Sequence, residues 1–398
     1  MVAANAIASE RKDRINDYMA QNPGATMDMV VQNYDSAYIH RRYLAHAPTE
    51  GASVLQLGGS DPEALRIAVQ TISEIPALNY TAVNLNCGCP SPKVAGRGCF
   101  GAALMNDPDR VASIVTAMSD ASDGLLPVTV KCRIGVETFD YDTSLRRFID
   151  TVAATGAVRH FDVHARVAML DLSPHGNRNI PPLHYDAVYR LVSDYPDIKF
   201  SLNGGLNTLE DVQSVLSDCP QLQGCMIGRA WAADPWRFST ADTTLYGCNQ
   251  PAAQHRWQVL TAFGRYTDAE EAKATTVKEL GHLRRRLLKA ITPLFAGEIR
   301  GKQYRIALDA AAQLIPTKKA GGSEKPPGHL LTPPLSSLIL DAASKHLSDE
   351  VLYRSPEESH DKFRWEQKRK TAKEEVLHDG VVASWQQNRK QDQMSAPQ

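Results

Sequence analysis

Several features that define whole classes of protein are missing from this chain of 398 residues. No apolar run is long enough to cross a membrane. The formal net charge is only -1, so the overall charge does not argue for nucleic-acid binding, and any such argument needs a local patch. The N-terminal stretch Met1–Met19 lacks the apolar core of a secretory signal. We therefore expect a cytoplasmic protein without a membrane segment, an organellar location remaining open.

Cysteine is present but not in patterns that build disulfides or metal sites. The chain has seven cysteines, an odd number with irregular spacing, which fits a reducing compartment. Cys87 and Cys89 are separated by one residue, and no second pair follows at zinc spacing, so we expect no metal. A Gly-x-Gly-x-x-Gly motif is also missing after the first clear strand, which disfavours a doubly wound dinucleotide-binding sheet.

A regular alternation of short apolar runs and amphipathic helices extends from about residue 50 to 235. This alternation predicts a parallel sheet with helices outside, an α/β fold of the TIM (β/α)8 barrel type. The expected strands are Met27–Val30, Val54–Leu57, Ala82–Leu85, Val128–Val130, Phe161–Val163, Phe200–Leu202 and Cys225–Ile227. No strand is found before the charged helix expected at Ser9–Ala20, so the barrel is expected to lack its first strand. The apolar run Leu335–Leu340 is a candidate to fill the gap.

Composition divides the chain into four parts. Residues 1–24 form a charged helix or a disordered segment, and residues 25–245 form the barrel. Residues 250–315 read as a small helical domain. Residues 316–398 combine a low-complexity linker rich in Lys, Gly and Pro with a strongly charged tail, and we expect the tail to be disordered.

Polar side chains and glycines occur at the ends of successive expected strands. Taken singly each is weak evidence, but residues at the carboxyl ends of parallel strands converge on one face, where barrels keep their active sites. Glycines after the last two strands allow backbone N–H groups to approach a phosphate, and a lysine can stabilise an anionic reduced flavin. The residues are Gln56, Asn86, Cys89, Lys131, His164, Arg166, Asn203, Gly204, Gly205, Gly228 and Arg229.

Cys89 is the most reactive group in this set. It lies in Asn86-Cys87-Gly88-Cys89-Pro90, directly after an apolar run. No base lies beside it in the sequence, and no metal partner is present. A thiol with a pKa of about 8.5 is mostly protonated at neutral pH, which suits a general acid that gives a proton to carbon.

These segments resemble a known family, the tRNA-dihydrouridine synthases, and within it the DusA-type subfamily. The similarity covers roughly residues 27 to 310, and Leu85–Met105 carries the most specific signature. The other matching segments are Pro127–Gly135, His164–Arg166, Leu172–Leu183 and Ser201–Gly205. The resemblance implies a TIM barrel that binds FMN and a helical domain that binds tRNA.

The resemblance also implies a reaction and a role for each matching residue. NADPH or NADH reduces FMN, which then reduces a D-loop uridine of tRNA at position 20 or its neighbour, while Cys89 protonates the base. Asn86 and Arg166 match residues near the flavin and the target base. The implied FMN contacts are Gln56, Lys131, His164, Asn203, Gly204, Gly205, Gly228 and Arg229.

A basic stretch in the helical domain gives separate support for RNA binding. Between Arg284 and Arg305 there are seven basic residues and one acidic residue, and Arg284 and Arg285 are the expected RNA contacts. A solvated helix face is the alternative explanation. Two other functions stay open: a flavin oxidoreductase for a small pyrimidine, and a catalytically impaired RNA-binding paralogue. We expect a monomer.

Overall fold

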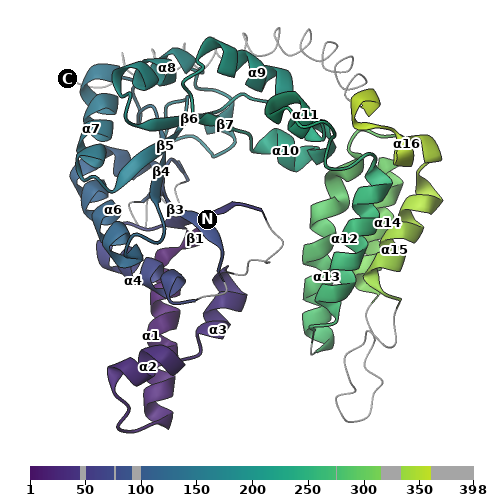
Figure 1. The fold of residues 1–398 in the computed structure, drawn as a ribbon, viewed down its shortest axis with the longest axis horizontal. Coiled ribbons are helices and arrows are strands. Elements are labelled where there is room, and N and C mark those ends of the chain that lie inside the picture. The colour runs from purple at the N-terminus through teal and green to yellow at the C-terminus, as the bar shows by residue number, and fades with distance from the viewer. Residues whose placement is uncertain (45–50, 76–77, 92–99, 275, 315–332, 360–398) are drawn as a thin grey trace. The chain divides into compact units, whose positions relative to one another are not determined.

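The computed structural model describes residues 1–44, 51–75, 78–91, 100–274, 276–314 and 333–359 (Figure 1). The contacts divide the chain into two units, and each is described by itself. The first comprises residues 1–205 and 216–226, and the second comprises residues 206–215 and the described residues from 227 onward. The expected low-structure segments at 316–332 and 360–398 lie outside the described residues.

The first unit is built on a seven-stranded parallel sheet in the order β1-β2-β3-β4-β5-β6-β7, so β1 and β7 form its edges. Helices alternate with the strands, which confirms the α/β, TIM-like fold expected from the sequence. The strands are β1 (Val2–Ala3), β2 (Ser53–Gly58), β3 (Tyr80–Cys87), β4 (Val128–Arg133), β5 (Val158–His164), β6 (Lys199–Asn203) and β7 (Gly224–Met226).

Two of the helices between the strands, α4 and α6, begin at aspartates whose side chains cap them. Asp61 accepts a hydrogen bond from the N–H of Glu63 at 3.2 Å, and Asp107 accepts one from that of Arg110 at 3.1 Å. The α-helices are α1 (Ala4–Gln21), α2 (Met27–Asn33), α3 (Ser36–Ile39), α4 (Pro62–Ser73), α6 (Pro108–Ser122), α7 (Arg146–Ala154), α8 (Tyr185–Asp194) and α9 (Leu209–Asp218). Short 3₁₀ or π-helical turns cover His40–Leu44, Gly101–Asn106, Tyr141–Leu145 and Gly176–Arg178.

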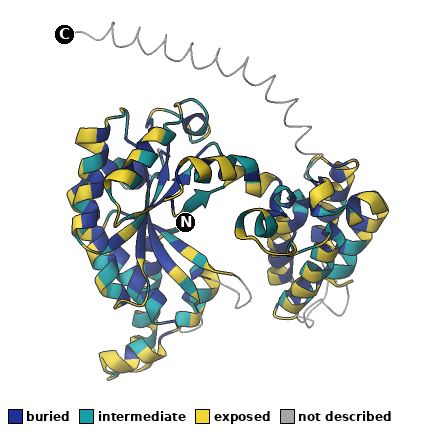
Figure 2. Ribbon diagram, turned by 45° about the horizontal axis from the view of Figure 1, so that its top comes forward, coloured by how far each residue is buried: buried dark blue, intermediate teal, exposed yellow. Residues whose placement is uncertain are grey.

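The apolar core of this unit lies between the sheet and its helices. Side chains alternate between the two faces of a strand, and on one face of β3 to β6 they are apolar and fully buried, as at Leu85, Val130, Val163 and Leu202. Figure 2 shows the buried residues concentrated on the strands and on one side of the helices. The opposite face of the same strands carries polar residues.

The start of the sheet corrects two expectations. Residues 27–30 are not a strand; they begin helix α2, whose first turn is capped by Thr26 accepting from the N–H of Met29. The sheet also has a strand ahead of α1, because Val2 and Ala3 pair with Leu57 and Gly58 in β2. Two residues give no periodic signal, which is why the sequence did not reveal this strand. The segment 1–24 belongs to the first unit.

The second unit is helical and packs around its own apolar cluster. Leu260, Leu280, Phe295, Tyr304 and Leu308 are among its buried members. Its helices are α10 (Arg229–Ala233), α11 (Ala241–Tyr246), α12 (Arg256–Glu271), α13 (Val277–Ile291), α14 (Gly301–Gln313), α15 (Leu335–His346) and α16 (Asp349–Tyr353), with 3₁₀ turns at Pro235–Phe238 and Thr292–Phe295.

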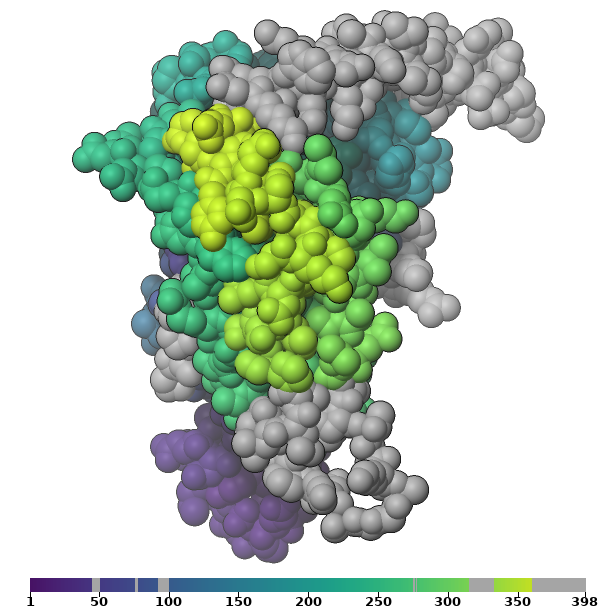
Figure 3. Space-filling view, turned by 90° about the vertical axis from the view of Figure 1, so that its right-hand side faces the viewer, coloured from purple at the N-terminus to yellow at the C-terminus, as the bar shows by residue number. Residues whose placement is uncertain are grey.

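Helices α15 and α16 lie where a linker and tail were expected. Leu335, Ile339, Ala342 and Ala343 share one face of α15 and are buried in the cluster of the second unit. Figure 3 shows α15 and α16, in yellow, over the green helices of this unit. Leu335–Leu340 therefore does not supply a barrel strand, because its apolar spacing is helical and α12 and α14 cover it.

Candidate active site at the carboxyl ends of the strands

The polar face of the sheet brings together most of the expected site residues. Strand register pairs Asn86 with Lys131 and His164 with Asn203. Gln56 and Asn84, one register step toward the amino ends, are also paired. Because all these strands are parallel, their carboxyl ends lie together at the same end of the sheet.

Hydrogen bonds to its backbone groups hold the turn that carries Cys89. The side-chain oxygen Oδ1 of Asn86 accepts hydrogen bonds from the N–H of Gly88 at 3.1 Å and of Cys89 at 3.0 Å. The carbonyl of Cys89 accepts from the N–H of Ala102 at 2.9 Å. Arg133 Nε donates to the carbonyl of Gly88 at 3.0 Å. The Cys89 side chain, which is partly exposed, therefore projects from a fixed backbone.

Lys131 and Asn203 form a second part of the site. Lys131 Nζ donates to Asn203 Oδ1 at 3.0 Å, and Asn203 Nδ2 donates to the carbonyl of Met226 at 2.7 Å, so the amide is oriented from both sides. Burial lowers the pKa of Lys131, and the charge of Asp162 partly offsets that effect. The ammonium group thus lies in a confined, polar environment.

His164 packs directly against the glycine pair that follows β6. Gly204 has a φ of +116° and Gly205 a φ of +74°, which side chains rarely tolerate. A Cβ on Gly204 would lie 2.7 Å from Cδ2 of His164, and one on Gly205 would lie 2.5 Å from Leu183. The hydroxyl of Tyr185 donates to the carbonyl of Gly204 at 2.6 Å. Glycine is therefore required at both positions.

Arg133 is a central residue that the sequence analysis did not select. Its side chain is almost fully buried, and its NH1 group donates to the carbonyls of Val167 at 2.9 Å and Asn177 at 3.3 Å. Burial, with a smaller effect of nearby Arg166, lowers the pKa of Arg133 to about 10. Its position two residues after Lys131 places it on the same face of β4, which was the available signal.

Arg166 is buried, and its guanidinium group binds backbone carbonyls. Its NH1 group donates to the carbonyls of Asn179 and Pro181. Arg166 therefore also holds the loop that follows β5.

The expected RNA contacts in the helical unit differ sharply from each other. Arg284 is fully buried and forms an ion pair with Glu271, so it is not available to RNA, and the expectation for this residue is wrong. Its place on the apolar face of α13 explains the burial. Arg285 is exposed.

The expected FMN contacts Gly228 and Arg229 are exposed and lie at the start of α10, where β7 ends at Met226.

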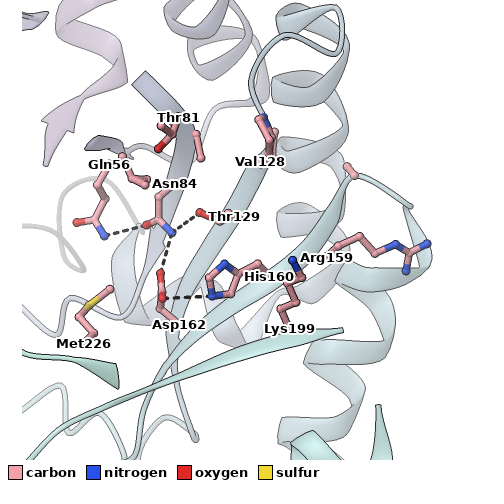
Figure 4. A pocket seen from close by; sticks show the side chains of 14 residues that line it. Gln56, Thr81, Asn84, Val128, Thr129, Arg159, His160, Asp162, Lys199 and Met226 are labelled. Carbon is pink, nitrogen blue, oxygen red and sulfur yellow. Dashed lines mark hydrogen bonds and ion pairs between the residues drawn. The ribbon is translucent and has the colours of Figure 1, made fainter. Parts of the chain in front are cut away.

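A pocket of about 600 Å³ opens at the amino ends of the strands, away from the end that carries Cys89 (Figure 4). Its polar lining includes Asn84, His160 and Asp162, and the imidazole Nε2 of His160 lies 3.7 Å from Asp162 Oδ1. Burial raises the pKa of Asp162 and lowers that of His160. Both shifts show that charge is costly here.

Among the residues that the structure describes, no group of three or more His, Cys, Asp or Glu side chains could hold a metal ion. In the same part of the chain, no helix is long and apolar enough to span a membrane.

The fold and its polar strand ends define a TIM-like α/β protein with a helical second unit. The family model "Dihydrouridine synthase (Dus)" matches residues 1–319, and the chain belongs to this family.

Relatives from several bacteria carry the name tRNA-dihydrouridine(20/20a) synthase. The one from Vibrio cholerae is 39% identical over 255 residues, which cover 63% of this chain and 74% of that protein. The one from Shewanella oneidensis is 43% identical over 236 residues, 58% of this chain and 67% of that protein. The one from Escherichia coli K12 is 39% identical over 272 residues, 68% of this chain and 74% of that protein.

Proposed function

We propose that this protein is a flavin-dependent tRNA-dihydrouridine synthase. It reduces a D-loop uridine of tRNA, at the position 20 or 20a named for its relatives, to 5,6-dihydrouridine. The main support from the structure is the placement of Cys89: a partly exposed thiol on a turn whose N–H and C=O groups are hydrogen-bonded. Its proton goes to C5 of the uracil ring. A tRNA substrate implies a compartment that contains tRNA, such as the cytoplasm.

The residues at the strand ends fit FMN. Gly204 and Gly205 hold positive φ angles at the end of β6, where His164 and Leu183 leave no room for a Cβ, and Lys131 offers a partly buried positive charge to an electron-rich ring. Gln56, His164 and Asn203 would supply hydrogen bonds to the ring edge, and Gly228 and Arg229 would contact the phosphate. FMN, if bound by these residues, would supply the hydride for C6, with NADPH or NADH as the reductant.

Lys131 and Arg133 lie close enough to Cys89 to interact with it electrostatically. Solvent would restore the proton that the Cys89 thiol gives to the base. Asn86 holds the turn during this cycle through the N–H groups of Gly88 and Cys89.

The helical unit would bind the RNA backbone. Arg285 is retained as a contact, and it is joined on α13 and α14 by other exposed basic side chains that can neutralise phosphates. They are Arg286, Lys289, Lys302 and Arg305, with Arg300 just before α14.

One observation favours a second candidate, an RNA-binding protein without catalysis. The edge strands β1 and β7 contain only two and three residues. Short edges give the flavin site weak support, because few ladder hydrogen bonds hold the strand ends in place.

Two measurements separate these functions. The purified protein should show flavin absorbance, or gain it when FMN is added; a colourless protein that binds no FMN would defeat both flavin-dependent readings. Cells that lack the gene should lose dihydrouridine from tRNA and regain it with the wild-type gene but not with Cys89→Ala. If the protein contains flavin but the dihydrouridine content of tRNA is unchanged in cells that lack the gene, a small pyrimidine would instead be favoured as the substrate.

A further inference from the structure

A chain of side-chain amides links the interior of the sheet to the turn that carries Cys89. Gln56 Nε2 donates to Asn84 Oδ1 at 2.9 Å, and Asn86 Nδ2 donates to Gln56 Oε1 at 2.9 Å. Asn86 Oδ1 then accepts from the backbone N–H groups of Gly88 and Cys89. The chain is buried at its inner end, where Asn84 is 3% exposed.

The direction of every hydrogen bond in this chain is set by its two ends. At the inner end, Asn84 Nδ2 donates to Thr129 Oγ1 at 2.8 Å and points to Asp162 Oδ2 at 3.5 Å (Figure 4). An ionised carboxylate can only accept, so the amide nitrogen of Asn84 must face it. At the outer end the backbone N–H groups can only donate, so they require the oxygen of Asn86.

We propose that Asn84 is a positioning residue for Cys89. Its oxygen faces Gln56 because its nitrogen is bound to Thr129 and faces Asp162, and this orientation determines which way the Gln56 amide points. Gln56 in turn presents its oxygen to Asn86, which leaves the Asn86 oxygen for the turn. The inference rests on the proposed function for its catalytic meaning, but the hydrogen-bond order does not depend on flavin or tRNA.

The chain of hydrogen-bonded amides leads us to expect a specific consequence when the Asn84 oxygen is removed. Gln56 then loses the acceptor of its amide nitrogen, and only the outer end still favours the original direction. Whenever the Gln56 amide turns over and presents its nitrogen to Asn86, Asn86 directs its oxygen toward Gln56, and the N–H groups of Gly88 and Cys89 lose their acceptor. The backbone of Cys89 would loosen although Asn84 does not touch it.

Two variants test this consequence. Asn84→Leu removes the oxygen that accepts from Gln56. Val83→Ala is the control, because Val83 is buried on the opposite face of β3 and its side chain has no polar group. Amide hydrogen exchange at Gly88 and Cys89 is the readout, measured on the folded proteins without flavin or tRNA.

We expect exchange at both amides to be roughly tenfold faster in Asn84→Leu, the effect of losing one hydrogen bond, and close to wild type in Val83→Ala. In a dihydrouridine assay, Asn84→Leu should lower kcat and leave KM for tRNA unchanged. If the proposed function fails, no variant makes dihydrouridine, yet the exchange pattern still appears.

Two results would overturn the proposal: wild-type exchange in folded Asn84→Leu, or equal acceleration in Val83→Ala. If Asn84→Leu does not fold, Asn84→Ala replaces it, since it removes the same side-chain oxygen with a smaller side chain. Faster exchange at Gly88 and Cys89 in Asn84→Ala supports the amide chain, and unchanged exchange rejects it.

Discussion

Replacing Arg284 should destabilise the helical unit without acting through RNA. The guanidinium group is fully buried, pairs with Glu271 on α12, and donates to the carbonyls of Leu314 and Pro333. Glu271 also accepts from the N–H of Leu335 at 2.9 Å, so the pair joins three helices. Removing one partner of such a pair leaves a buried charge and costs about 3–5 kcal/mol. Arg284→Met should therefore remove a large part of the unit's stability.

The assay is urea unfolding followed by tryptophan fluorescence. All five tryptophans lie at or after position 231, so the signal does not come from the sheet of the first unit. Arg285→Met is the matched control: this exposed neighbour should change the free energy of unfolding by less than about 0.5 kcal/mol and lower tRNA affinity instead. Combining Arg284→Met with Glu271→Gln should recover part of the loss, because a neutral amide still accepts from Leu335. Wild-type unfolding of Arg284→Met together with lost tRNA binding would refute the reasoning.

Three further predictions concern the sheet. Gly204→Ala should cost about 1–3 kcal/mol, because φ is +116° and His164 blocks the Cβ, and it should cost more than Gly124→Ala, where the space is open; equal thermal shifts would contradict this. Burial raises the folded-state pKa of Asp162, so the stability gained from its proton is complete below the ordinary value of 3.8 and is lost as pH rises through the raised pKa. Asp162→Asn should therefore be more stable than wild type to urea at neutral pH, with no advantage below 3.8; a constant difference at all pH values would count against it. Cys89→Ala should keep flavin absorbance but form dihydrouridine roughly 10²–10⁴ times more slowly, and full activity would exclude Cys89 as the acid.

The sheet could be predicted from sequence wherever a strand is long enough to show a pattern. The runs that end near Leu57, Leu85 and Val163 alternate with amphipathic helices, and the structure places strands there. Val2 and Ala3 are too few to show a period, and Met27–Val30 is apolar enough for a strand yet forms a helix under the Thr26 cap. Such short segments are decided by pairing and capping partners that are distant or easily overlooked in the sequence.

The polar residues of the site were recognisable one by one, but their partners were not. Lys131 and Asn203 are 72 positions apart and meet only because β4, β5 and β6 are adjacent. Arg133 became part of the site through carbonyls on other loops, which leave no trace in composition. Arg284 and Arg285 are equivalent in the sequence, but they differ in burial, because neighbouring residues on α13 are separated by about 100° of helical rotation.

The sequence by itself determined the α/β order of elements, the family resemblance and the chemical groups at the strand ends, because these depend on local periodicity and on residue type. Only the tertiary structure decided which of those groups are held, buried or open. It showed that Arg284 is buried in the helical unit and paired with Glu271, that Val2 and Ala3 extend the sheet, and that Asn84 is linked through Gln56 and Asn86 to Cys89. Those outcomes depend on contacts between distant segments, and such contacts exist only once the chain has folded.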